Sequence, residues 1–247
     1  AALAAAPARA DAATAPTEQS MRASHEALQG RLQQNPFQRP LVLESEESPD
    51  GLAGDIHAVV DVAFDRVRSA LNDPGQWCEV LSLHSNTKYC RAEVQAGQPT
   101  LLLYAGSKTP QSLTSALRVD MTFSRTSDTP GLLAVHLQAN RGPLGTSDYR
   151  VTLAAIPLRT GGTYLHLRYA TATNPLARLA MQAYLATAGR DKVGFTRTNP
   201  QEDGPPEYLG GARGAIERNT MRYYLAIYAY LASRLVAPAQ QLETRLQ

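Results

Sequence analysis

The chain of 247 residues is long enough for one large domain or two small ones. With 43% hydrophobic and 19% charged residues it has the composition of a globular protein, which excludes an intrinsically disordered chain. Its net charge of +2 is spread along the sequence without a basic run, so we expect no nucleic-acid partner and at most transient contact with a membrane.

The first ten residues differ in composition from the rest. Residues 1–10, AALAAAPARA, have the pattern of the end of a hydrophobic export signal with a small-x-small cleavage site. We therefore expect a mature chain that begins near Asp11 in the bacterial periplasm; the alternative is a disordered alanine-rich tail. The longest charge-free apolar run, residues 223–233, is far shorter than the ~20 residues that cross a bilayer, so we expect no transmembrane segment.

The next segments indicate a helix and a hairpin. Residues 11–36 are predicted to form a polar tail and then a short helix of about 17–34. The stretches RPLVLESEE and AGDIHAVVDVAF, separated by the turn-rich SPDG, predict two paired strands. In the second strand Ile56 and Ala58 alternate with His57, which predicts one buried face and one wetter face that carries the histidine.

Two short helices are predicted next, separated by the breaker NDPG at 72–75. Asp65 is expected to cap the first, and the second carries Trp77. Cys78 in that helix and Cys90 in the following strand are the only cysteines, and in an oxidising periplasm they predict a disulfide. The alternative is a pair of buried reduced thiols. A zinc site is poorly supported, because no CxxC pair or histidine cluster supplies four ligands.

A long antiparallel series follows, with connectors rich in Gly, Pro, Asp and Thr. Its six strands are expected at residues 87–94, 100–106, 113–125, 132–141, 147–156 and 163–171. After them we expect a helix from Asn174 to about Ala188, a small hairpin around 202–204 and a long amphipathic helix over 212–236. The predicted apolar stripe of this last helix consists of Met221, Tyr224, Leu225, Tyr228, Leu231 and Leu235.

This order of elements resembles the helix-grip fold of the START/SRPBCC superfamily, in which a curved antiparallel sheet wraps around a long C-terminal helix. The likeness covers residues 37–236. The segments ARGAIERNTMRYYLAIYAYL and KVGFT also resemble a family of uncharacterised exported bacterial START-like proteins, which brings no known activity. The segment 174–210 departs from the simplest pattern, in which the last strand leads almost directly to the last helix. We expect an α+β fold with a START-like domain at 37–236 and a C-terminal tail at 237–247.

The resemblance implies a cavity between the sheet and the final helix that holds a hydrophobic small molecule or lipid. Strand alternation and the helix stripe then indicate the residues that would line it. These predicted lining residues are Trp77, Leu103, Leu117, Val119, Met121, Phe123, Tyr149, Val151, Leu153, Leu167, Tyr169, Glu217, Met221, Tyr224, Leu225 and Tyr228. A concave sheet and one helix leave a space that either side chains or a ligand can fill, so plain core packing is the alternative.

Every standard catalytic motif we sought, among them GxGxxG, the P-loop, GxSxG and HExxH, is missing from the sequence. Glu217 on the helix stripe is placed to meet the polar end of a ligand; the alternative is a first-turn carboxylate favoured by the helix dipole. His84 is the best candidate for a site histidine, with a helix-end histidine as its alternative, whereas His57 and His166 are expected to be solvated or capping. We expect no metal and no cofactor.

These patterns predict a periplasmic binding or carrier protein that transports a hydrophobic small molecule or lipid. A cyclase/aromatase-like enzyme of the same superfamily is one alternative, and it would need a polar group in the pocket, such as Glu217 or His84. A filled-core domain that acts through protein partners is the other. Neither the identity of the ligand nor the oligomeric state follows from the sequence.

Overall fold

The computed structural model describes residues 15–142, 146–187, 189–199 and 205–246. The predicted leader at 1–10 and the predicted turn at 202–204 lie outside this part of the chain. Within it, no helix combines the length and the apolar character needed to cross a membrane.

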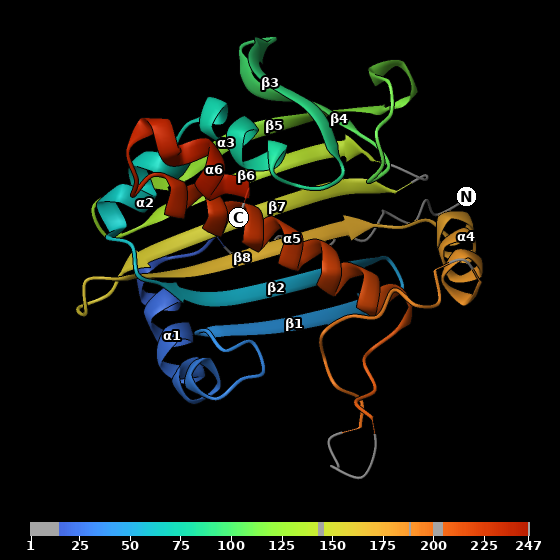
Figure 1. Cartoon of the computed structure of the whole chain (residues 1–247), viewed down its shortest axis with the longest axis horizontal. Coiled ribbons are helices and arrows are strands. Elements are labelled where there is room, and N and C mark those ends of the chain that lie inside the picture. The colour runs from blue at the N-terminus through green and yellow to red at the C-terminus, as the bar shows by residue number, and fades with distance from the viewer. Residues whose placement is uncertain (1–14, 143–145, 188, 200–204, 247) are drawn as a thin grey trace, which may run out of the picture.

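One antiparallel sheet of eight strands forms the centre of the structure (Figure 1). Its strands lie side by side in the order β1-β2-β8-β7-β6-β5-β4-β3. Their bounds are β1 Leu41–Ser48, β2 Gly51–Val60, β3 Thr87–Gln95, β4 Gln98–Ala105, β5 Leu117–Asp128, β6 Leu133–Arg141, β7 Ser147–Pro157 and β8 Thr163–Ala172. The predicted hairpin and the predicted six-strand series are confirmed, and the pairing of β2 with β8 joins them into one sheet.

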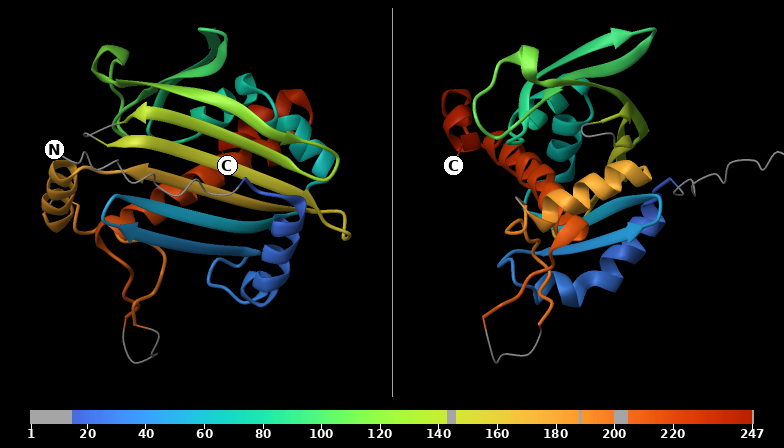
Figure 2. Two further views of the ribbon diagram at one scale, coloured as in Figure 1. Left: turned by 180° about the vertical axis from the view of Figure 1, so that it is seen from behind. Right: turned by 90° about the vertical axis from the view of Figure 1, so that its right-hand side faces the viewer.

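Two helices cover opposite faces of the sheet (Figures 1 and 2). The long helix α5, Gly211–Ser233, crosses the concave face, and α1, Glu18–Gln33, lies against the other face near β1. A curved antiparallel sheet around one long helix is the helix-grip architecture that the order of elements predicts.

Close contact between α5 and the sheet depends on a glycine. A Cβ atom on Gly54 of β2 would lie 2.3 Å from Oγ1 of Thr220 and 3.2 Å from the Cβ atom of that threonine. Thr220 is buried, and its hydroxyl donates to the carbonyl of Ile216 one turn earlier, at 2.9 Å. Gly54 therefore lets the helix come closer to the strand than a side chain would permit.

Helix α1 covers a second, smaller apolar cluster. Its N-cap Thr17 and Ser20 accept hydrogen bonds from each other's backbone N–H groups, so the helix begins with a capping box. The buried members of this cluster are Met21, Leu32, Val42, Leu132, Ala154, Ile156 and Tyr164. Because α1 covers this face, His57 is buried, and the prediction of a wetter face along β2 is wrong.

The short helices α2, Phe64–Leu71, and α3, Pro74–Ser82, lie at one end of the sheet beside the C-terminal part of α5 (Figure 1). The prediction that Asp65 caps α2 is wrong. The N-cap residue is Ala63, and Asp65 lies inside the first turn, where its carboxylate is favoured by the helix dipole. The N-cap of α2 therefore lies two residues earlier in the chain than predicted.

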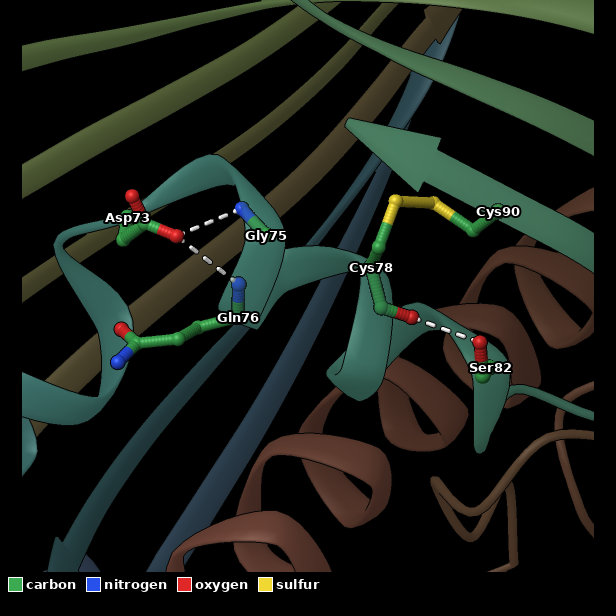
Figure 3. The surroundings of a disulfide bond; sticks show 6 residues. All are labelled: Asp73, Gly75, Gln76, Cys78, Ser82 and Cys90. Carbon is green, nitrogen blue, oxygen red and sulfur yellow. Dashed lines mark hydrogen bonds between the residues drawn. A yellow bond between two sulfur atoms is a disulfide. The ribbon is translucent and has the colours of Figure 1, made fainter. Parts of the chain in front are cut away.

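A disulfide bond joins Cys78 of α3 to Cys90 of β3, with a Cα–Cα distance of 5.2 Å (Figure 3). The prediction of this bond is confirmed. Asp73 caps α3 and accepts the N–H groups of Gly75 and Gln76 at 2.8 and 3.3 Å (Figure 3). The bond therefore fastens a well-capped helix to the outermost strand of the sheet.

The remaining segments refine three predictions. Residues Leu113–Ser115, expected to begin a strand, form the short 3-10 helix η1 instead. Helix α4, Pro175–Ala186, follows β8 as expected. The described part of the predicted hairpin is confirmed, since the N–H of Gly194 donates to the carbonyl of Leu209 at 2.7 Å and that of Leu209 donates to the carbonyl of Thr196 at 2.8 Å.

The segment predicted as a C-terminal tail is also folded. It forms η3, Pro238–Gln240, and α6, Gln241–Leu246. The guanidinium of Arg245 donates to the hydroxyl of Ser233 at 3.0 Å and lies 4.9 Å from the centre of the Tyr230 ring. The end of α5 is therefore covered by the segment that follows it.

Candidate functional site

The space between the concave face and α5 holds the main apolar cluster of the protein. Most of the predicted lining residues meet there. They are Trp77, Leu103, Val119, Met121, Phe123, Val151, Leu153, Leu167, Tyr169, Met221 and Tyr224, with the half-buried Tyr149 packed against them. These residues come from the sheet, α3 and α5, so the fold brings together side chains that lie as much as 147 positions apart in the sequence.

Four predicted lining residues lie outside this cluster: Glu217, which is buried, and three exposed residues. Leu117, Leu225 and Tyr228 are 44%, 45% and 41% exposed. The buried face of α5 contains Ile216, Thr220 and residues that recur every three to four positions after them. This face is rotated about the helix axis by about 100° from the predicted stripe, which is the angle between two consecutive residues of an α-helix. The prediction that Leu225 and Tyr228 face the sheet is wrong. The reason is that aromatic and aliphatic side chains occupy most of the circumference of this helix, so its own sequence does not select the face that packs.

A cavity with a volume of about 650 Å³ opens at the β1 edge of the sheet. Apolar side chains of β1, of the connection before it and of the segment before α5 line it together with polar groups. Its lining consists of Arg31, Gln34, Asn35, Pro36, Phe37, Leu41, Val42, Leu43, Phe195, Thr196 and Arg197. Leu41 and Leu43 also belong to the main cluster, so the cavity borders the apolar interior directly.

Two phenylalanines form the aromatic wall of this cavity. The rings of Phe37 and Phe195 lie edge to face, with 6.1 Å between their centres. The sequence interpretation missed both, since Phe37 follows a helix-breaking Asn-Pro pair and Phe195 belongs to the segment that departs from the family pattern. The scarcity of the residue was the available signal, because the chain has only four phenylalanines and two of them, Phe37 and Phe195, lie outside the helices and strands.

The structure gives Glu217 a role that differs from both sequence-based interpretations, which were contact with the polar end of a ligand and a carboxylate in the first turn of the helix. It is the seventh residue of α5, so the interpretation as a first-turn carboxylate is wrong. Its buried carboxylate accepts hydrogen bonds from the hydroxyls of Ser45 and Thr196 at 2.9 and 2.7 Å. It also accepts the N–H groups of Phe195 and Thr196 at 2.7 and 3.0 Å. With four protein donors around it, this carboxylate fixes the wall of the cavity, and contact with a ligand is disfavoured.

A row of aromatic rings runs through the other side of the cluster. Ring centres of Tyr149 and Tyr169 lie 5.9 Å apart, those of Tyr169 and Tyr223 5.1 Å apart, and those of Tyr223 and His84 4.7 Å apart. Burial raises the pKa of Tyr169 and that of Tyr223, so both phenols stay neutral. The structure thus places His84, the best histidine candidate, inside the protein against α5, two residues after α3 ends at Ser82.

The other two histidines belong to a polar network under α1. His57 Nδ1 is hydrogen bonded to the Tyr164 hydroxyl at 2.8 Å, and the rings of His57 and His166 are stacked 4.2 Å apart. His166 Nε2 is 2.7 Å from a carboxylate oxygen of Asp55, and Ser24 of α1 is 2.9 Å from the Tyr164 hydroxyl. The expectation of solvated or capping histidines is therefore wrong, because α1 buries this face and its serine completes the network.

The class defined by this architecture is the helix-grip fold, here with an apolar interior and a cavity at the sheet edge. No family model matches the chain, and no curated protein matches it. Among solved structures it is similar to norcoclaurine synthase from Thalictrum flavum, at 13% identity and a TM-score of 0.38 over 61% of this chain and 78% of that one. It is also similar to the Zhui aromatase/cyclase from Streptomyces sp. R1128, at 13% identity and a TM-score of 0.43 over 80% and 97%. A protein from Thermus thermophilus reaches 10% identity and a TM-score of 0.44 over 80% and 100%. Such distant likenesses say nothing of activity.

Proposed function

We propose that this protein is a periplasmic carrier that binds a hydrophobic small molecule or lipid. The observation that carries the proposal is the cavity of about 650 Å³ between Phe37, Phe195 and strand β1. This volume lies within the range of about 300–1,000 Å³ that is typical of small-molecule sites. Its combination of apolar walls with a few polar groups is also the usual composition of such sites.

The lining of the cavity suggests how an amphipathic ligand would lie. Phe37, Leu41 and Phe195 offer apolar contact, and Leu41 and Leu43 continue into the main cluster under α5. Arg31, at one side, pairs with Glu44 at 2.5 Å and keeps its charge near the rim. An apolar chain or ring would therefore bind toward the interior, and its polar end would remain near the rim.

Two observations support export. The Cys78–Cys90 disulfide is compatible with an oxidising compartment, and residues 1–10 have the composition of a signal region. The periplasm is the bacterial compartment that fits both features. A carrier there would move its ligand between membranes or enzymes without a chemical step.

A filled-core domain that acts through protein partners is the second candidate. It is favoured by the packing of the predicted lining residues, because of the four cavities described along the chain only one, of about 420 Å³, is bordered by any of them, namely Phe123. The enzyme alternative loses its first candidate, since the carboxylate of Glu217 is bound by four protein donors.

Native mass spectrometry of protein prepared from the periplasm, followed by titration with the fluorescent fatty acid cis-parinaric acid, tests the proposal. We expect a co-purified apolar molecule and saturable binding of the probe. Phe37→Ala and Phe195→Ala should each weaken probe binding by about tenfold. Val94→Ala, an exposed change on β3, is the matched control and should leave it unchanged. Protein that carries no molecule and binds no probe would contradict the carrier function and favour the filled-core domain.

A further inference from the structure

The imidazole of His84 has a fixed tautomer. Its Nδ1 atom accepts a hydrogen bond from the backbone N–H of Asn86 at 3.3 Å. A backbone N–H can only donate, so Nδ1 carries no proton, and the neutral ring holds its proton on Nε2. Burial, with the charges of Arg222 and Lys108, lowers the pKa of His84 to about 4. At neutral pH the group is therefore an uncharged N–H donor.

This donor is buried and unused. His84 is only 7% exposed, and its Nε2 atom has no hydrogen-bond partner among the described residues. Its ring packs against Tyr223 with the ring centres 4.7 Å apart. Buried polar groups are usually satisfied, so this N–H is a donor that is free to bind an acceptor.

The positive charges of Arg222 and Lys108 act on this donor, and that of Arg218 acts on both of them. None of the ion pairs found within the described ranges includes Lys108, Arg218 or Arg222. The pKa of Lys108 is lowered chiefly by the charge of Arg222, and that of Arg222 is lowered by burial and then by Arg218. These positively charged side chains thus repel one another, and a bound anion would relieve the repulsion.

The side chain of Arg222 and the backbone that leads to Lys108 are held by neutral groups. Arg222 donates to the side-chain oxygen of Asn219 at 3.2 Å, and Asn219 donates to the hydroxyl of Tyr169 at 3.4 Å. The turn that carries Lys108 is tied to the His84 corner, because the Asn86 side chain donates to the carbonyl of Gly106 at 2.7 Å. The N–H of Gly106 returns a bond to the carbonyl of Asn86 at 2.8 Å. Donor and cations therefore belong to one anchored arrangement.

We propose that His84 Nε2, Arg222 and Lys108 form a binding site for an oxyanion, the carboxylate or phosphate group of a small acidic molecule, with the ring of Tyr223 as its wall. The N–H of His84 would donate one hydrogen bond to the oxyanion, and the guanidinium of Arg222 would donate one or two more. Lys108 would contribute charge from the exposed rim. The site shares no residue with the cavity at Phe37 and Phe195, so either assignment can fail without the other.

Titration of protein labelled with ¹⁵N in its histidines tests the site at neutral pH. The probes are benzoate, inorganic phosphate and benzamide, the neutral counterpart of benzoate. We expect benzoate or phosphate to shift the Nε2–H resonance of His84 in a saturable way, and benzamide to bind at least about tenfold more weakly than benzoate. Saturation by phosphate alone would support the site and assign it to phosphate. An unmoved His84 resonance with both anions, or equal binding of benzoate and benzamide, would overturn it.

Charge-removing variants complete the test. Arg222→Gln should weaken binding of the anion by about tenfold or more, and Lys108→Gln, at the rim, should weaken it less. Arg234→Gln removes an exposed charge from the end of the same helix and should leave binding unchanged. Thermal melts of all three confirm that they are folded, and only folded variants are compared. An equal loss of anion affinity with Arg234→Gln would show that the anion responds only to the overall charge of the protein, and it would overturn the proposed site.

Discussion

Thr196 donates twice to the carboxylate of Glu217, from its N–H at 3.0 Å and from its hydroxyl at 2.7 Å. The two residues are 21 positions apart, one in the segment before α5 and one in the helix. Ser45 of β1 donates to the same carboxylate. This group therefore joins the sheet edge, the segment before α5 and α5 itself, and it places Phe195 at the wall of the cavity.

Glu217→Gln should destabilise the protein by about 2–3 kcal/mol. An amide offers one acceptor oxygen and adds an N–H₂ group that faces N–H and hydroxyl donors, so buried donors are left without a partner. Urea unfolding measures the change. Glu47→Gln, at an exposed position, is the control, and we expect it to change stability by less than about 0.5 kcal/mol. A change at Glu217 as small as that of the control would show that the segment before α5 is not held by this carboxylate.

Gly54→Ala should cost about 1–3 kcal/mol, because the added methyl group would overlap Oγ1 of Thr220. Combination with Thr220→Ala should recover part of this loss, with a coupling free energy of about 1 kcal/mol between the two changes. Gly30→Ala on α1 is the matched control. A Cβ atom there meets nothing within 4 Å, and the change should stabilise the helix by up to about 1 kcal/mol. Additive losses in the double variant would contradict the contact between α5 and β2.

The Cys78–Cys90 bond predicts a simple mass measurement. Protein taken from the periplasm and alkylated without reductant should gain no alkyl group, and after reduction in denaturant it should gain two. Cys78→Ser should lower the free energy of unfolding by about 3 kcal/mol, the value expected for a short closed loop. Reduced wild-type protein should show a similar loss. Two alkyl groups added without reductant would exclude the bond in the exported protein.

Stability should fall as the pH is lowered from about 6.5 to about 4. Burial lowers the pKa of His84 and that of His57 to about 4 in the folded protein, whereas a histidine in the unfolded chain titrates near 6.5. Below pH 6.5 the unfolded state therefore binds protons that the folded state does not. The stabilisation is complete above this pH and is lost through the window at up to about 1.4 kcal/mol per pH unit for each histidine.

Urea unfolding at pH 7.5, 6.0 and 4.5 measures this dependence. His84→Phe replaces the imidazole by another aromatic ring and removes one titrating group, so it should make the dependence of stability on pH less steep. Equal slopes in the variant and the wild type would mean that the low pKa of His84 does not contribute.

The rotation of α5 can be checked by two tyrosines of the same helix. Tyr224 is buried, whereas Tyr228 is largely exposed beneath the guanidinium of Arg39, 5.0 Å from the ring centre. Tyr224→Ala should cost about 3 kcal/mol or more and Tyr228→Ala less than about 1 kcal/mol. Similar losses of stability at both positions would contradict this rotation and support the buried face that the sequence of α5 predicts.

The order and type of most elements could be predicted from the sequence. Strand alternation such as Val119, Met121 and Phe123 depends on the period of two in an extended chain, and it marks the buried face of β5 correctly. Turn residues separate the strands, and the presence of only two cysteines behind a leader that resembles an export signal predicts the disulfide between them. These signals depend on neighbouring residues or on composition, so they can be interpreted without knowledge of the fold.

What only the tertiary structure decided is which surface covers which. His57 became buried because α1 lies over its face of the sheet, and Leu225 stayed exposed because α5 turned another side to β2. The cavity formed where β1 meets a segment more than 150 residues later in the chain. Packing between distant elements depends on shape and on close approach, as at Gly54, and a periodic pattern within one element carries no information about the surface it will meet.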